Sequence, residues 1–106
     1  MEEMIFKIIV NGGDARSRAM IAISEAKKGN LVKAKELLEE SNSFLDKAHD
    51  VQTELIQNEA SGNKTEISLL MVHSQDHLMN AITVRDLAKE FIDMYEEMNE
   101  LKKKIQ

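Results

Sequence analysis

No proline interrupts the 106 residues of this chain, and glycine occurs only 4 times. These two residues are the strongest helix breakers, whereas the alanine, leucine, glutamate, lysine and methionine that are frequent here favour helices. A chain of this length has the size of one domain with one hydrophobic core. The sequence therefore predicts a single all-α domain over residues 1–106.

The charge and the apolar runs of the chain exclude several classes of function. With 19 acidic and 14 basic residues, the net charge of −5 would repel a phosphate backbone, so nucleic-acid binding is not expected. The sequence shows no export leader and no apolar run that could span a bilayer. It also contains no cysteine, which excludes disulfides and fits a reducing compartment. We expect a cytoplasmic protein that is not inserted in a membrane.

Two short polar segments divide the chain, one around Gly29 and one around Gly62. Glycine there can end a helix, and a nearby asparagine or threonine can begin the next one. The predicted helices cover residues 2–28, 31–60 and 65–104. Because the connections are short, neighbouring helices should be antiparallel. In the first helix, the pair Gly12-Gly13 favours a kink or a close approach of another backbone.

The third predicted helix carries a heptad seam of the kind found in coiled coils. The seam consists of Leu70, His77, Val84, Phe91, Met98 and Ile105, together with Asn80, Leu87, Met94 and Leu101. From Val84 onwards we expect the seam to pack within the chain's own bundle. Between Ile67 and Ile82, apolar residues surround most of the helix, which is more surface than two partner helices would cover. This surplus predicts a homo-oligomer built around the third helix.

A polar stripe interrupts this apolar segment. His73, Asp76, His77 and Asn80 are spaced i, i+3, i+4 and i+7 and therefore share one helix face, whereas Gln75 lies on another. Polar groups placed among apolar side chains are costly unless each finds a partner. The stripe therefore calls for a structural or functional explanation.

Four explanations are consistent with the spacing. His77 and Asn80 could be satisfied core residues that set register and oligomer number. Two histidines at i and i+4 could bind zinc, but the metalloprotease pattern needs glutamate where this chain has Ser74. In a trimer, three copies of Asp76 could bind a hard cation on the axis. Finally, His73 could be a nucleophile that accepts a phosphoryl group, with His77 one turn away.

The segment that contains the stripe resembles a family signature. Val72-His73-Ser74-Gln75-Asp76-His77-Leu78-Met79 is similar to that of the lactose/cellobiose-type enzyme IIA of the bacterial phosphoenolpyruvate-dependent sugar phosphotransferase system. Three further groups of residues match the same family, namely Gly13-Asp14-Ala15-Arg16-Ser17, Ala48-His49 with Gln52-Thr53, and Glu59-Ala60. The resemblance covers nearly the whole chain and is closer to the cellobiose, chitobiose and lichenan branch.

The resemblance implies a homotrimer of three-helix subunits and a phosphoryl carrier. His73 would be phosphorylated by the phosphocarrier protein HPr and would pass the group to the sugar-specific enzyme IIB. Enzyme IIB then passes the group to the sugar that enters through the membrane component, enzyme IIC. The expected sugar is a β-linked disaccharide such as cellobiose. Asp76 matches a ligand of a divalent metal ion, expected to be Mg²⁺, on the trimer axis. Ser74 stands where relatives often have glycine or alanine, and its hydroxyl is expected near the phosphate.

The predicted site therefore consists of His73, Gln75 and His77 for phosphoryl transfer and Asp76 for metal. Because Gln75 faces away from its own His73, it is expected to serve a neighbouring chain. Arg16 is a candidate phosphate partner, and His49 is left outside the site. The alternatives are a helical interaction module that performs no chemistry and a metal-binding helical protein.

Overall fold

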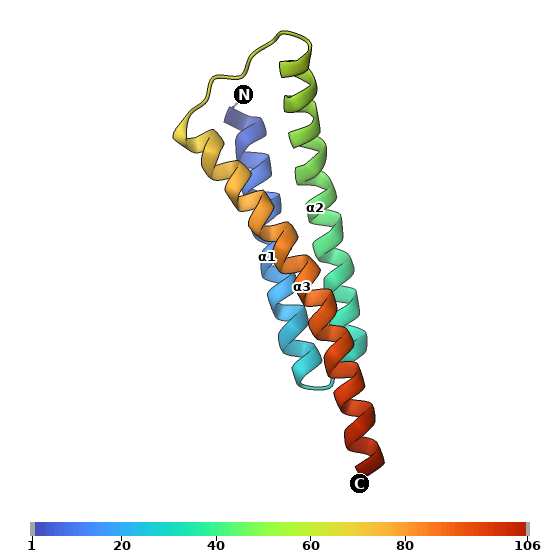
Figure 1. The fold of residues 1–106 in the computed structure, drawn as a ribbon. Helices are drawn as coiled ribbons and strands as arrows, with labels where there is room; N and C mark the ends of the chain where they lie inside the picture. Colours follow the sequence, from blue (N-terminus) through green and yellow to red (C-terminus); the bar gives the residue numbers. More distant parts are fainter. Residues whose placement is uncertain (1, 106) are drawn as a thin grey trace.

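The computed structural model describes residues 2–105. Three α-helices make up nearly all of it: α1 spans Glu2–Lys27, α2 spans Leu31–Ala60 and α3 spans Leu69–Ile105. They lie side by side in one elongated bundle of 63 × 19 × 19 Å, with α1 and α2 forming an antiparallel hairpin (Figure 1). The predicted all-α architecture of three long antiparallel helices is confirmed.

Both glycines that were expected to end helices do so in the left-handed conformation. Gly29 has φ of 90° and Gly62 has φ of 96°, values that a residue with a side chain rarely adopts. At the end of α1 and of α2, a backbone hydrogen bond folds the chain back onto the last turn of the helix. The Asn30 amide donates to the Glu25 carbonyl at 2.9 Å, and the Asn63 amide donates to the Asn58 carbonyl at 2.9 Å. These bonds satisfy carbonyls that the helix ends leave open.

The third helix begins later than the sequence predicted, at Leu69 instead of residue 65. Its capping residue is Ser68, whose hydroxyl oxygen accepts a hydrogen bond from the Met71 amide at 3.1 Å. Serine caps a helix in this way because its oxygen replaces the missing backbone acceptor of the first turn. The other ends differ less: α1 ends at Lys27 rather than 28, and α3 ends at Ile105 rather than 104.

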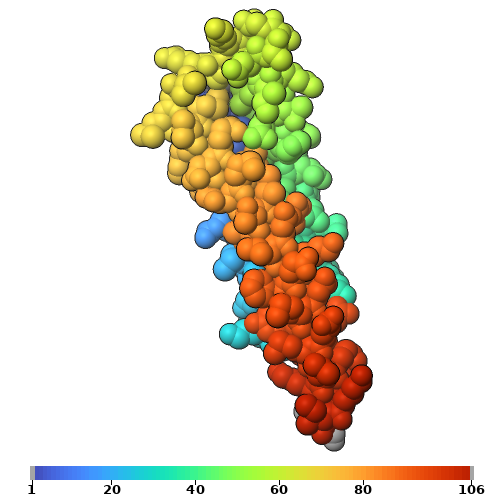
Figure 2. Space-filling view, in the orientation of Figure 1, coloured from blue at the N-terminus to red at the C-terminus, as the bar shows by residue number. Residues whose placement is uncertain are grey.

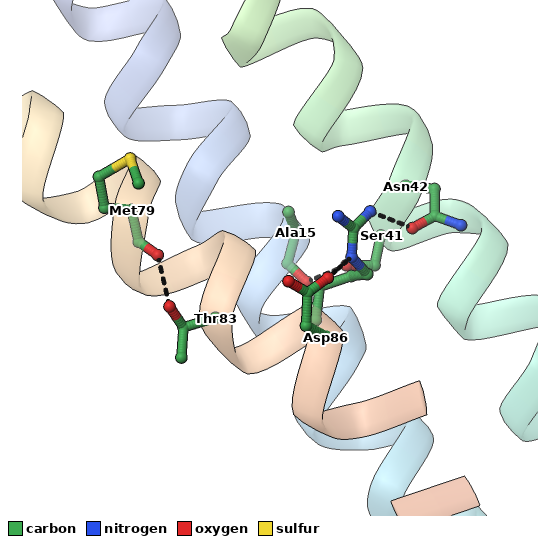
Figure 3. Close-up of polar contacts among 7 residues, drawn as sticks. Ala15, Ser41, Asn42, Met79, Thr83 and Asp86 are labelled. Atoms are coloured by element: carbon green, nitrogen blue, oxygen red, sulfur yellow. Dashed lines mark hydrogen bonds and ion pairs between the residues drawn. The ribbon is translucent and has the colours of Figure 1, made fainter. Parts of the chain in front are cut away.

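Helix α1 contacts both other helices extensively, whereas α2 and α3 contact each other much less. Its buried face is a heptad stripe of mostly small residues: Ile5, Ile8, Gly12, Ala15, Ala19, Ala22 and Ala26. A side chain on Gly12 would lie 3.7 Å from the Leu78 Cα of α3, so the two backbones approach closely there. Between α1 and α2, the buried Ser41 hydroxyl donates to the Ala15 carbonyl at 2.7 Å (Figure 3).

The seam of α3 does not pack inside the chain, contrary to the expectation for Val84 onwards. The α3 residues that are buried against the bundle are instead Ser74, Leu78, Ala81, Ala88 and Ile92. The large seam residues face outwards, with Leu87 52% exposed, Met94 56% and Leu101 59%. Three of these five buried residues are small, which fits the close contact of α3 with α1, and the large seam residues lie outside. Helix α3 runs along the front of the bundle (Figure 2), and its C-terminal end projects beyond the α1–α2 turn (Figure 1).

Candidate functional site

His73 lies in the second turn of α3, just after the segment that Ser68 caps. Its side chain is exposed to solvent. Together with Leu69 and Leu70, it lines an open hollow at this end of the helix. The imidazole is therefore accessible to another molecule and lies on a regular, capped helix that restricts how it can move.

His77 lies one helical turn further on, and its ring stands beside that of His73. The two ring centroids are 5.1 Å apart and the ring planes are tilted by 35°. His77 is half-buried because α1 approaches it at Gly13. A Cβ atom on Gly13 would lie 3.7 Å from the His77 Nε2, at van der Waals contact, so α1 passes directly beside this nitrogen. The predicted proximity of the two histidines is present in the structure.

Gln75 points away from the histidine pair, towards α2. Its Oε1 accepts a hydrogen bond from Gln52 Nε2 at 2.7 Å, and its Nε2 lies 3.7 Å from the Met71 sulfur. The predicted difference in face between Gln75 and His73 is therefore present. Gln52 was not predicted as a site residue, because pairing across helices depends on tertiary placement. The only signal in the sequence was that Gln52 lies in one of the segments that resemble the family.

Ser74 does not lie where the sequence suggested. Its side chain is fully buried against the bundle, and its hydroxyl donates to the Met71 carbonyl at 2.7 Å. The expectation of a hydroxyl near the phosphate on His73 is therefore wrong. Its position in the helix explains the difference, because residue 74 falls in the small-residue stripe that packs on α1.

Asp76 is exposed and lies on the outer face of α3, which it shares with Leu69, Val72 and Met79. Among residues 2–105, no cluster of three histidine, cysteine, aspartate or glutamate side chains is placed to hold a metal ion. One carboxylate is too small a donor set for a divalent cation, which takes six or more oxygen ligands. The part of the chain that the structure describes therefore forms no metal site around Asp76 within one subunit.

Two further residues from the sequence analysis lie differently with respect to the histidines. Arg16 of α1 lines a hollow together with His77 and Asn80 of α3. His49 is exposed on α2 and lines neither this hollow nor the one that contains His73. The structure thus places Arg16 beside the histidine pair and leaves His49 out.

An exposed imidazole beside a second histidine, on a helix of an all-α bundle, is the arrangement that the family resemblance implies. A family model described as the lactose/cellobiose-specific IIA subunit of the phosphotransferase system matches residues 3–96. The chain belongs to this IIA family. The resemblance inferred from the sequence is confirmed, and the protein is a phosphotransferase component of a sugar phosphotransferase system.

Individual IIA proteins support the same assignment over most of their length. The lichenan-specific IIA component of Bacillus subtilis is 57% identical over 100 residues, which is 94% of this chain and 91% of that protein. The N,N'-diacetylchitobiose-specific component of Escherichia coli K12 is 41% identical over 98 residues, which is 92% of this chain and 84% of that protein. The relatives agree with the cellobiose, chitobiose and lichenan branch.

Solved IIA structures share the fold. The crystal structure of the cellobiose-specific enzyme IIA from Bacillus anthracis superposes with a TM-score of 0.91 at 52% identity, covering 92% of this chain and 90% of that one. The Escherichia coli chitobiose IIA, solved in solution in its complex with HPr, gives 0.80 at 40% identity, covering 92% and 95%. That complex shows a IIA protein of this fold bound to HPr.

Proposed function

We propose that this IIA protein carries a phosphoryl group on His73, taking it from phospho-HPr and giving it to enzyme IIB. The observation that carries the proposal is the exposed His73 imidazole beside His77 in a chain of the IIA family. The HPr complex of the Escherichia coli chitobiose IIA supports HPr as the donor. Family membership favours this function over a helical module without chemistry.

The first step forms one bond and breaks one. A ring nitrogen of His73 uses its lone pair to attack phosphorus, while the bond from phosphorus to the donor breaks and its electron pair stays on HPr. The second step is the same exchange with enzyme IIB as the nucleophile. Because little covalent chemistry is left to the protein, positioning and charge stabilisation carry most of the catalysis. The capped start of α3 supplies a fixed position for the attacking ring.

The proposed cargo of the whole system is a β-linked disaccharide such as cellobiose, imported through enzyme IIC. The support is the naming of relatives for lichenan, diacetylchitobiose and cellobiose. The proposed location is the cytoplasm, where phosphoenolpyruvate is available to the carriers. Among the described helices, none has both the length and the apolar character needed to cross a bilayer.

The proposed assembly is a homotrimer held by the outer face of α3. This face carries large apolar side chains along its whole length: Leu69, Val72, Met79, Leu87, Phe91, Met94, Met98, Leu101 and Ile105. A monomer rarely exposes so long an apolar stripe, and the heptad spacing suits packing against identical helices. The number three comes from the family resemblance.

Asp76 has its proposed role in that trimer. It lies on the same outer face, so three copies would meet near the axis, where one negative charge per chain needs neutralisation. A divalent cation, proposed to be Mg²⁺, fits three carboxylates together with water. Residues 2–105 of a single chain do not supply this donor set. No step of the proposed phosphoryl transfer depends on the metal.

The function is tested by sugar uptake coupled to phosphorylation. We expect that His73→Ala abolishes sugar-dependent phosphoryl flow in a system rebuilt from phosphoenolpyruvate, enzyme I, HPr, this protein and its enzymes IIB and IIC. His49→Ala is the matched control, because it removes an exposed imidazole from α2. Full flow through the His73→Ala variant would refute the proposal.

A further inference from the structure

A hollow between α1 and α3 lies beside the histidine pair. Its lining consists of Arg16, His77, Asn80, Thr83 and Val84. His77 connects it to the proposed site, because the His77 ring borders the hollow and also stands 5.1 Å from the His73 ring, centroid to centroid. Only the His77 side chain therefore stands between the hollow and the imidazole that is proposed to carry phosphate.

The charge in this hollow is positive although the protein as a whole is acidic. Among the described residues no carboxylate lines it, whereas the net charge of the chain is −5. The nearest carboxylate along α3, that of Asp76, does not line the hollow. The Thr83 hydroxyl donates to the Met79 carbonyl at 3.1 Å (Figure 3). Among residues 2–105, Arg16 is the only lysine or arginine that lines the hollow. An anion would be stabilised here more than on most of the surface.

Arg16 differs from its neighbour Arg18 in what it contacts. Arg18 pairs with Asp14 at 3.6 Å and with Glu40 at 4.0 Å, and its guanidinium lies 4.6 Å from the centre of the Phe44 ring. Within residues 2–105, Arg16 takes part in none of the ion pairs. Arg18 is thus directed at α2, whereas Arg16 is exposed and borders the hollow on the α3 side.

Arg16 on α1 lies opposite the part of α3 that carries the histidine pair. Arg16 follows Gly13 by three residues, so the two lie on the same side of α1. Gly13 is the position that faces the His77 Nε2. A guanidinium one turn from this contact belongs to the same junction of α1 and α3 as the two imidazoles.

We propose that Arg16 binds the phosphoryl oxygens while the group is transferred to and held on His73. The planar guanidinium donates paired hydrogen bonds that fit a phosphate group, and the interaction strengthens as negative charge is placed on the oxygens. Arg16 forms and breaks no covalent bond in this role and keeps all its protons. The inference rests on the proposed phosphorylation of His73.

The test compares Arg16→Gln with Arg18→Gln, two changes that remove the same charge from the same helix. Single-turnover phosphorylation by phospho-HPr gives the rate constant and its dependence on phospho-HPr concentration. We expect Arg16→Gln to lower the maximal rate constant by about 10- to 100-fold, the size expected for losing hydrogen bonds to a charged group. Arg18→Gln should leave it near the wild-type value. Arg16→Lys should fall between the two, because it keeps the charge and loses the paired geometry.

A second readout separates phosphate binding from a structural effect. The ³¹P chemical shift of the phosphohistidine should differ between the wild type and Arg16→Gln and agree between the wild type and Arg18→Gln. Equal rates and equal shifts for both glutamine variants, with a wild type that is phosphorylated on His73, would overturn the Arg16 proposal alone. A wild type that takes up no phosphate on His73 would overturn the proposed function as well.

Discussion

The imidazole rings of His73 and His77 stand 5.1 Å apart on successive turns of α3, one exposed and the other half-buried against α1. The two rings therefore lie in different environments. His73 is open to a partner protein, whereas the His77 ring packs beside Gly13 of α1. The arrangement suits one ring that exchanges a phosphoryl group and a second that stabilises it.

Replacing His77 with alanine should slow phosphorylation of His73 without abolishing it. We expect a loss of about 10- to 100-fold in the rate constant, because one hydrogen bond to the charged phosphoryl group disappears. The measurement is single-turnover transfer from phospho-HPr, with His49→Ala as the control. A rate equal to that of the control would show that His77 has no part in the transfer.

Gln75 is predicted to act on a neighbouring chain, because it points away from its own His73 and towards α2, where it bonds to Gln52 at 2.7 Å. The test mixes Gln75→Ala subunits with His73→Ala subunits, so that phosphate is accepted only by chains that lack their own Gln75. We expect phosphorylation in these mixed assemblies to exceed that of pure Gln75→Ala assemblies. If mixing changes nothing, action across subunits should be abandoned.

Asp76 is predicted to serve assembly rather than transfer. We expect Asp76→Asn to lower the divalent metal content of the purified protein or to change the stability of the trimer. Phosphorylation of His73 should continue, because no step of the transfer uses the Asp76 carboxylate. Metal analysis, sedimentation and the phosphorylation assay test this together. An intact trimer that is no longer phosphorylated would contradict the prediction.

The outer face of α3 is predicted to hold the subunits together. Phe91 is 41% exposed in the single chain, so we expect Phe91→Glu to weaken association by about 1.5–3 kcal/mol per subunit while leaving helix content unchanged. Analytical ultracentrifugation and circular dichroism give the two quantities. Val32→Glu on α2, at a site that is 75% exposed, is the control. A wild type that sediments as a monomer at micromolar concentration would refute the assembly.

The helices were predictable because their signals are local. The lack of proline, the two glycines with positive φ and the heptad spacing set the number of helices and most of their ends. The start of α3 was missed because Thr65 and Ser68 are both plausible caps, and only the hydrogen bond from the Met71 amide identifies Ser68.

The packing of α3 was less predictable. Apolar periodicity assigns large residues to the core, yet the inner face of α3 carries Ser74, Ala81 and Ala88. Small residues suit this face because α1 lies close to α3, as the approach of Gly12 to Leu78 shows, and this closeness depends on the partner helix and not on α3 alone. The same limit applies to the site. The shared stripe of His73, Asp76 and His77 follows from spacing, whereas the Gln52–Gln75 bond requires knowing where α2 lies.

The central claim is that His73 accepts and releases phosphate. The most direct test is to incubate the protein with phosphoenolpyruvate, enzyme I and HPr and to locate any acid-labile phosphate by mass spectrometry. We expect one phosphate per chain on His73, removed when the matching enzyme IIB is added, and none on the His73→Ala variant. Phosphate on another residue, or none on the wild-type chain while HPr is fully phosphorylated, would contradict it.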